Sequence, residues 1–331
     1  MERFALAAAV VLGFALTAAL CSLFVPLRRV LERREQQQQP VQSEQPRPAP
    51  LRAPLWGGLC AAAGTVAAVG VGWLAACVGQ PELLGSEGRL MTRLLTALAG
   101  SLAFGAVGLA EDLARMRSPA ALGLRRDVRL LLEALAAAFV LLLLRAAGCL
   151  PRGLGVPGAG YVLLGSAVPF LWAVLMVTLA ECARIAERDE GTVCGAAFVA
   201  MLALMMAEAG LGVSGLAVLP AALAGALVAL GLWAFPPAKL GAGCCGSLLA
   251  AGAIGCIPLS LDMTSLTVPL ALPFWAAGGL LAAQLLCAKR TGKPLRCWVK
   301  KHKMSPETVF LCSFALSAVG YVLALALLRW C

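Results

Sequence analysis

Two adjacent carboxylates follow a long apolar segment of this sequence. Glu111 and Asp112 come directly after an apolar run that ends near Ala110, at the expected edge of a membrane-spanning helix. A carboxylate at that boundary is costly and is usually retained for a role. Mg²⁺ commonly binds one or two carboxylates together with substrate phosphate oxygens, and arginines grip phosphate through paired hydrogen bonds. The arginines that follow are Arg115, Arg117, Arg125, Arg126 and Arg129. The pattern indicates a metal–phosphate site, and the competing interpretation is a pair of solvated loop acids.

A second acidic group lies further along the chain, in the segment "AECARIAERDEGTVCG" (180–195). It supplies Glu181, Glu187 and Glu190, together with Asp189, and arginines are interspersed among them. An ordinary solvated loop of mixed charge explains this group equally well by itself. Two acidic groups expected on the same membrane face favour a shared site.

Two other segments are weaker signals. The glycine-rich "KLGAGCCGSLLAAGAIG" (239–255) has the small-residue spacing that lets membrane helices pack closely. The basic "CAKRTGKPLRCWVKKHKMSPE" (287–307) contains the only histidine, His302. The simpler interpretation of this basic segment is a positively charged anchor at the membrane surface. The more specific alternative is that it binds phosphate.

The composition requires that these residues be positioned by membrane helices. The chain of 331 residues is 61% hydrophobic and 13% charged, with a mean hydropathy of +0.88, whereas soluble domains carry about 25% charged residues. Apolar stretches long enough to cross a bilayer recur along the chain, and such spans must be helical to satisfy their backbone groups. We therefore predict an all-α polytopic membrane protein, a single integral membrane domain over residues 1–331. About ten spans are expected, at 4–26, 55–78, 93–110, 130–148, 159–179, 193–209, 212–234, 243–260, 266–287 and 308–329.

The distribution of positive charge predicts the orientation. The odd-numbered connections hold 21 of the 27 Lys and Arg residues, so these loops are expected to be cytoplasmic and both termini external. The Gln- and Pro-rich residues 28–52 predict a flexible cytoplasmic linker between the first two spans. Anionic lipid headgroups, and not nucleic acid, account for the net charge of +10.

Taken in order, these segments resemble the polyprenyl-phosphate N-acetylhexosamine-1-phosphate transferase superfamily (glycosyltransferase family 4), in particular its phospho-N-acetylmuramoyl-pentapeptide transferase branch. The resemblance covers most of the chain. The matching segments are "APLWGGL" (53–59), "GLAEDLAR" (108–115) with "GLRRDVRLLLE" (123–133), "ERDEGTVCG" (187–195), "GAGCCGSLLAAG" (241–252) and "KPLRCWVKK" (293–301).

The resemblance implies a reaction, a location and partners. Phospho-MurNAc-pentapeptide would pass from a UDP-linked donor to undecaprenyl phosphate with Mg²⁺, giving lipid I and UMP for peptidoglycan synthesis. The site would lie on the cytoplasmic face of a bacterial inner membrane. Undecaprenyl phosphate, a UDP-sugar and membrane lipids are the implied partners, and other envelope-synthesis proteins and a homodimer are further candidates.

The resemblance also implies roles for individual residues. Glu111 and Asp112 occupy the paired catalytic acids. Asp112, Glu187 and Glu190 fall at positions implicated in metal binding. The phosphate-binding candidates are Arg115 and Arg129, which replace family lysines, and Arg296 and Lys300 in the basic segment.

At several positions this sequence differs from the family pattern. These differences bear on whether the protein can catalyse the family reaction. The family's metal-binding aspartate before Gly-Ser is Cys244 here, and a thiol is a poor ligand for Mg²⁺. Arg296, Cys297 and Trp298 stand in place of three histidines, and two asparagines are replaced by Glu181 and Arg184.

Three interpretations follow from these departures. The protein is a transferase with a remodelled site, an impaired or non-catalytic relative that binds polyprenyl phosphate or acts as a scaffold, or an unrelated transporter or other membrane protein in which the motifs are coincidental. The spans consist mostly of Ala, Leu, Val and Gly, whereas a transporter would need polar residues near the bilayer midplane, which disfavours the third.

Overall fold

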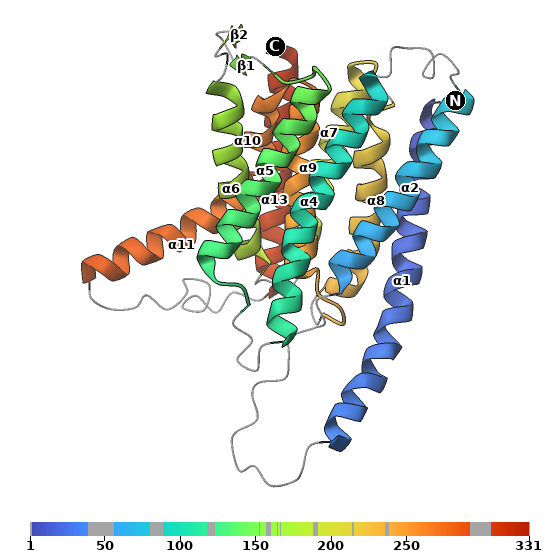
Figure 1. Ribbon diagram of the computed structural model, residues 1–331, viewed down its shortest axis with the longest axis vertical. Helices are drawn as coiled ribbons and strands as arrows, with labels where there is room; N and C mark the ends of the chain where they lie inside the picture. The colour runs from blue at the N-terminus through green and yellow to red at the C-terminus, as the bar shows by residue number, and fades with distance from the viewer. Residues whose placement is uncertain are drawn as a thin grey trace.

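A computed structural model gives the architecture of the chain as a bundle of membrane-length helices (Figure 1). The structure describes residues 2–38, 56–79, 89–117, 123–151, 153–156, 160–163, 165, 167–187, 191–213, 215–235, 238–291 and 306–330.

The described elements follow the predicted order of apolar segments. The first helices are α1 (Glu2–Gln38), α2 (Gly57–Gly79), α4 (Arg89–Arg117) and α5 (Arg126–Ala146). A short hairpin of β1 (Gly153–Val156) and β2 (Gly160–Leu163) separates them from α6 (Ala167–Ala186). The remaining helices are α7 (Thr192–Gly210), α8 (Val218–Ala234), α9 (Gly243–Ser260), the 3₁₀ turn η1 (Thr264–Leu266), α10 (Thr267–Leu270), α11 (Leu272–Thr291) and α13 (Pro306–Trp330).

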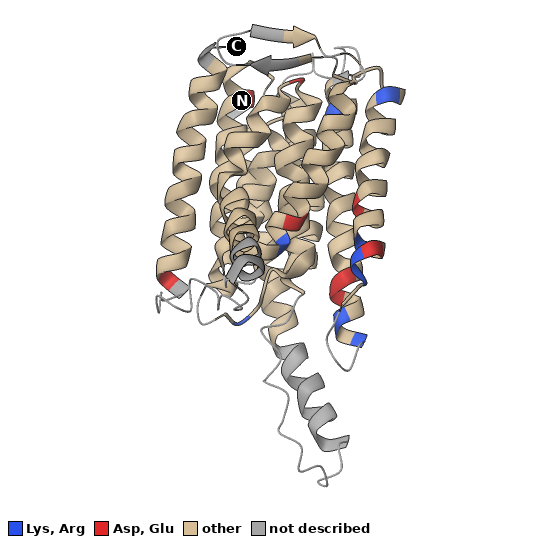
Figure 2. Cartoon of the chain, turned by 90° about the vertical axis from the view of Figure 1, so that its left-hand side faces the viewer, with Lys and Arg blue, Asp and Glu red and all other residues tan. Residues whose placement is uncertain are grey.

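The helices confirm the predicted all-α polytopic class. Seven described helices are long and apolar enough to cross a membrane, and a bent helix pair makes an eighth. The apolar α8 is shorter, at 17 residues. The two chain termini lie at the same end of the bundle (Figure 1). Among the described residues, the charged ones lie mainly towards the opposite end, as Figure 2 shows, and we call this end the site end.

Helix α9 forms the centre of the bundle. All of its residues are buried, and α4 packs along its length. Small residues make this possible, since a Cβ added at Gly108 of α4 would meet the Cys244 carbonyl of α9. Close backbone approach through small residues is the usual way in which membrane helices associate, because lipid tails compete for apolar contact. The packing of α4 on α9 therefore fixes the depth and rotation of the acidic residues on α4.

The ends of two predicted spans are corrected by the structure. Helix α4 continues to Arg117, about two turns beyond the predicted end at residue 110. Helix α1 continues to Gln38, so residues 28–38 of the predicted linker are helical, and residues 39–55 lie outside the described part of the chain. Good helix formers continue both segments past the point where their hydropathy falls.

The predicted fifth span begins too early. Residues 160–163, expected to be helical, instead pair antiparallel with residues 153–156. Glycine favours turns and extended backbone over helix, and the segment before α6 is rich in it; Gly165 adopts a left-handed φ of +58°. The helix starts only after this turn, at Ala167.

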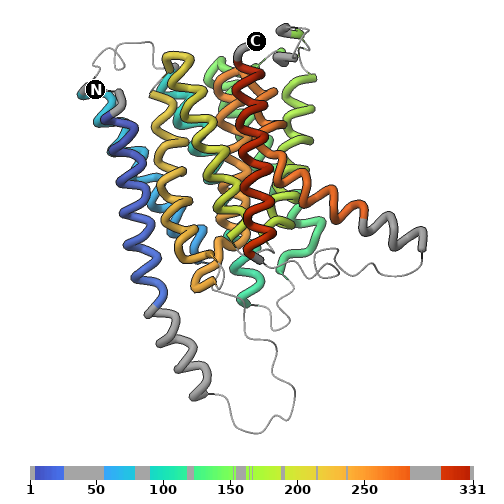
Figure 3. The backbone as a smooth tube through the Cα atoms, turned by 180° about the vertical axis from the view of Figure 1, so that it is seen from behind, coloured from blue at the N-terminus to red at the C-terminus, as the bar shows by residue number. Residues whose placement is uncertain are grey.

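The predicted ninth span is broken. Residues Thr264–Leu270 and Leu272–Ala283 are bent by 63° at the break, and α11 leaves the bundle obliquely (Figure 3). Pro273 has no N–H to offer the carbonyl of Pro269, four residues earlier, so the helix cannot run straight through. Gly320 of α13 packs against this Pro269 carbonyl, where a Cβ would clash.

Candidate functional site

The paired acids lie inside a helix and are buried. Glu111 and Asp112 are 2% and 1% exposed, in the penultimate turns of α4. The interpretation of the pair as solvated loop acids is therefore wrong. The extension of α4 to Arg117 and the cover provided by α9 remove both carboxylates from solvent. Residues Arg117, Arg125 and Arg126 of the neighbouring basic segment are exposed.

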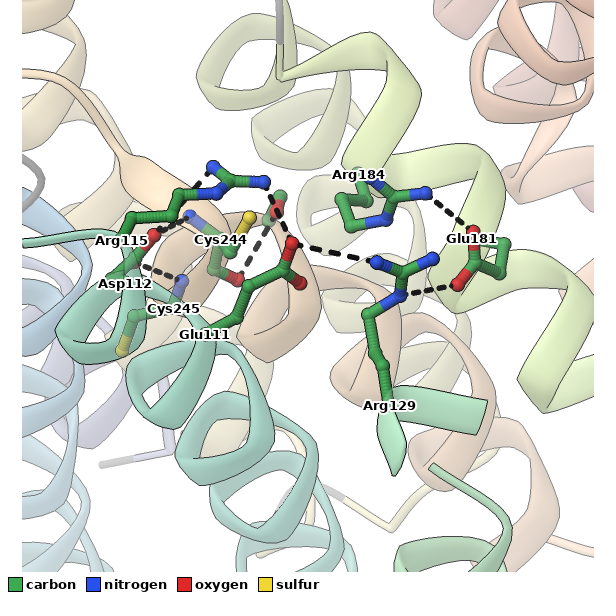
Figure 4. A network of polar contacts seen from close by, with 9 residues as sticks. Glu111, Asp112, Arg115, Arg129, Glu181, Arg184, Cys244 and Cys245 are labelled. Atoms are coloured by element: carbon green, nitrogen blue, oxygen red, sulfur yellow. Dashed lines mark hydrogen bonds and ion pairs between the residues drawn. The ribbon is translucent and has the colours of Figure 1, made fainter. Parts of the chain in front are cut away.

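Asp112 binds the first turn of α9. Its Oδ1 accepts the backbone N–H of Cys244 at 3.1 Å, and its Oδ2 accepts that of Cys245 at 2.9 Å, as Figure 4 shows. The N-cap residue of α9, Ala242, makes no side-chain capping bond. Asp112 supplies the missing cap from another helix, and its negative charge suits the positive end of the α9 dipole.

Two glycines permit this contact. Gly108, one turn before Asp112 on α4, faces the Cys244 carbonyl, where a Cβ would clash. Gly243 opens α9 with a φ of +67°, a conformation that glycine adopts without steric cost. Together they let α4 come close enough for a short aspartate side chain to reach the amides.

An ionic chain links three helices beside this cap. Glu111 Oε1 lies 2.7 Å from Arg115 Nη2 on α4 and 3.6 Å from Arg129 Nη1 on α5. The Nε of Arg129 donates to Glu181 Oε1 on α6 at 2.7 Å, and Arg184 Nη2 donates to Glu181 Oε2 at 2.6 Å. Figure 4 shows the chain running from Arg115 to Arg184. Through Arg129 it links Glu111 of the first acidic group to Glu181 of the second.

Helix α6 is held in place for this network by a contact deeper in the bundle. The Trp172 indole Nε1 donates to the Gly255 carbonyl of α9 at 3.3 Å, and the side chain is buried. Gly255 also packs against Met176, where a Cβ would clash. Helices α4 and α6 therefore both dock on α9, and α5, which carries Arg129, packs against α4 and α6.

The second acidic group is placed only in part. Glu187 follows the end of α6 and interacts electrostatically with Arg115 and Cys244, so it faces the same cluster. The turn behind it is closed by Gly191, with φ of +77°, and by the Thr192 hydroxyl, which donates to the Ala186 carbonyl at 2.9 Å. The candidates Glu190, Arg296 and Lys300 lie outside the described residues.

Glu133 is a buried acid that was not among the site residues predicted from the sequence. It is 0% exposed, and neither carboxylate oxygen has a hydrogen-bond partner within the described structure. It lies one turn after Arg129 on the same face of α5 and interacts electrostatically with Arg129 and Glu181. The sequence feature that could have pointed to Glu133 is its position, because it is an isolated acid four residues after an arginine within an apolar run.

The described donors do not fit a Mg²⁺ site. Within the part of the chain that the structure describes, no three His, Cys, Asp or Glu side chains come together to hold a metal ion. Both Asp112 oxygens face backbone amides, and position 244 offers a buried thiol. Mg²⁺ needs near-octahedral oxygen ligands, which a thiol does not supply. The cluster can instead offer guanidinium groups to an anion.

Comparison with models of protein families places the site within a known sequence pattern. Residues 94–262 match Glycosyl transferase family 4, a segment slightly longer than half of the chain that runs from α4 to the end of α9. No curated protein matches the chain.

Proposed function

The chain belongs to glycosyl transferase family 4, and from this membership we propose that it is a membrane phospho-sugar transferase homologue that binds a polyprenyl phosphate but transfers phospho-sugar poorly or not at all. The proposed functional type is that of phospho-N-acetylmuramoyl-pentapeptide transferase, which the motifs of this sequence resemble. The family assignment supports a lipid phosphate and a sugar nucleotide as the substrate classes. The substrates proposed within them are undecaprenyl phosphate and UDP-MurNAc-pentapeptide.

One observation carries the proposal of impaired transfer. Asp112 is the family acid that this sequence keeps, and both of its oxygens bind the amides of Cys244 and Cys245. The same turn of α9 carries a thiol where the resemblance implies a metal-binding aspartate. Both Asp112 oxygens are thus hydrogen-bonded to the first turn of α9. The second carboxylate, which the resemblance implies at position 244, is absent. No step of the proposed activity runs through Mg²⁺.

The arginines support retained phosphate binding. Arg115, Arg129 and Arg184 converge from three helices, and each has N–H groups beyond those that bind Glu111 and Glu181. Their side chains are 24%, 8% and 14% exposed, so Arg115 is the one most open to a ligand. Partly buried guanidinium groups bind phosphate more strongly than fully solvated ones, because water screens them less.

We further propose a location and orientation. The positive charge of the odd-numbered loops supports a cytoplasmic orientation of the site end, and the proposed functional type supports a bacterial inner membrane. There a lipid phosphate held in the membrane can meet a soluble ligand. A role as a scaffold for envelope-synthesis proteins, with or without a homodimer, is compatible with this placement.

A transferase with a remodelled site is the second candidate. It is favoured by the carboxylates that remain near Arg115, since Glu111 Oε2 is buried without a partner in the described structure and Glu187 lies close by. These acids would have to support phospho-sugar transfer without the metal-binding aspartate that the resemblance implies at position 244.

Two measurements on the full chain in lipid nanodiscs distinguish the candidates. Undecaprenyl phosphate binding is measured directly, and UMP release is followed with UDP-MurNAc-pentapeptide and Mg²⁺ or Mn²⁺. The proposal expects binding that weakens in Arg115→Gln, with little or no UMP release. The exposed neighbour Arg126→Gln is the matched control, which should bind normally.

Each outcome decides between the candidates. UMP release that disappears in Asp112→Asn would establish the remodelled transferase. Absence of lipid binding would overturn the proposal altogether. Appearance of UMP release when Cys244→Asp is combined with histidines at positions 296–298 would support the impaired-site explanation directly.

A further inference from the structure

Two cysteines face each other across the α1–α2 contact, away from the ionic cluster. Cys21 on α1 and Cys60 on α2 are 0% and 1% exposed, and neither forms a disulfide in the structure. The two thiols interact electrostatically across the contact. Buried cysteines often act only as small apolar residues, and the surroundings of this pair distinguish it from them.

The register of the two antiparallel helices puts these thiols opposite each other. Gly64 faces Thr17 so closely that an added Cβ would lie 3.1 Å from the Thr17 backbone nitrogen. One turn further, four residues along α1 and four back along α2, are Cys21 and Cys60. The Phe24 and Trp56 rings stack in the next turn, with centroids 5.9 Å apart and planes at 13°. The helix contacts one turn before and one turn after the pair therefore keep the two thiols opposite each other.

We infer that Cys21 and Cys60 are a redox-active pair, a modification site that closes to an interhelical disulfide. A disulfide needs close Cα atoms and converging Cβ directions, and the backbone approach at Gly64 brings this part of α1 and α2 together. The oxidant is a peroxide, because a small neutral molecule can enter an apolar helix contact that excludes charged reagents. The inference does not depend on the proposed function.

Oxidation of the pair takes two steps. Either cysteine can act first as the thiolate nucleophile. When Cys60 acts first, it attacks the O–O bond of hydrogen peroxide, forming a sulfenic acid and releasing water. Cys21 then attacks that sulfur, forming the S–S bond and releasing a second water. In total, two thiols and one peroxide give one disulfide and two waters.

The disulfide would fasten α1 to the bundle. The membrane segment of α1 is only 28% buried and packs mainly on α2 and α8. Helix α2 in turn touches the first turn of α9, since Gly58 packs against Gly246, where a Cβ would clash. Oxidation would therefore stiffen the support behind Cys245 without touching the ionic chain.

The test uses the full chain in lipid vesicles with a protease site inserted between residues 39 and 55. After peroxide treatment and cleavage, the α1 fragment should remain attached on a non-reducing gel and be released by dithiothreitol. Peptide mass spectrometry should identify a Cys21–Cys60 linkage. Release of the fragment from the oxidised wild-type chain, or a linkage to another cysteine, would overturn the inference.

Variants test whether these two cysteines form the pair. In Cys21→Ser, a sulfenic acid should accumulate on Cys60 and be trapped by dimedone, and in Cys60→Ser it should accumulate on Cys21. Trapping in neither variant would overturn the inference. Cys194 and Cys245 are the thiols bordering the pair, and Cys194→Ser and Cys245→Ser should cross-link like the wild type. Moving the thiol by one residue, with Cys60→Ala and Ala61→Cys together, should abolish the linkage, because it rotates the sulfur away from α1.

Discussion

Asp112 on α4 accepts the Cys245 amide of α9 at 2.9 Å, in a bond that joins residues 133 apart in sequence. With the neighbouring bond from Cys244 at 3.1 Å, the carboxylate caps a helix that lies at the centre of the bundle. The acid that first suggested metal chemistry is therefore a structural cap in this protein.

Removing the Asp112 carboxylate should destabilise the bundle. In Asp112→Ala, two buried amides at the start of α9 lose their acceptor, and the free energy of unfolding should fall by roughly 2 kcal/mol. Asp112→Asn should cost less, because its carbonyl oxygen can still accept one N–H. Thermal unfolding in detergent measures both, and Asp127→Ala, at an exposed position of α5, is the matched control. Equal stability of Asp112→Ala and the wild type would contradict the cap.

Arg129 should be coupled energetically to Glu181. The Arg129 Nε to Glu181 Oε1 bond of 2.7 Å has partners 8% and 22% exposed, so either single change removes one partner from a mostly buried charge, while Glu181 keeps Arg184 and Arg129 keeps Glu111. Arg129→Met should lower the free energy of unfolding by about 1.5–3 kcal/mol. Combining it with Glu181→Gln should cost less than the two single changes added. Additive losses in this double-mutant cycle would show that the pair does not interact in the folded protein.

Glycine substitutions should have opposite effects at two positions. Gly108→Ala places a Cβ against the Cys244 carbonyl, which should push α4 from α9 and cost about 1–3 kcal/mol. Gly70 of α2 has open space around its Cβ position, so Gly70→Ala should stabilise its helix by about 0.5–1 kcal/mol. Unfolding midpoints of the two variants, measured together, check the expectation. A Gly108→Ala protein as stable as Gly70→Ala would mean that the helix crossing is looser than described.

Replacing Glu133 should stabilise the protein. Its buried carboxyl group has no hydrogen-bond partner in the described structure, and a carboxyl group without partners costs free energy in an apolar interior. Glu133→Leu keeps a similar volume and should raise the stability by about 1–3 kcal/mol. The measurement is thermal unfolding, with exposed Leu135→Met on the same helix as the control. A loss of stability in Glu133→Leu would instead reveal a ligand or proton partner for this acid.

The sequence by itself determined the class of the protein and the neighbourhood of the site. Its apolar content excludes a soluble domain, and in lipid a chain of this composition must satisfy its backbone in helices. The order of the acidic, glycine-rich and basic segments was enough to indicate the transferase family, which the match of residues 94–262 confirms. Local composition also predicted that Glu111, Asp112 and Arg115 would lie near one another, since neighbours on one helix end are close whatever the fold.

Only the tertiary structure decided what these residues do. Hydropathy falls at Glu111, so the sequence pattern ended the helix at residue 110, whereas α9 covers the acids and α4 runs on to Arg117. The partners of Asp112 depend on how two helices cross, which Gly108 and Gly243 set through contacts distant in sequence. The same holds for the alignment of Cys21 with Cys60 and for the Arg129–Glu181 bond across α5 and α6. Periodicity reports which residues share a helix, but the approach of two helices depends on atoms that meet only when the bundle packs.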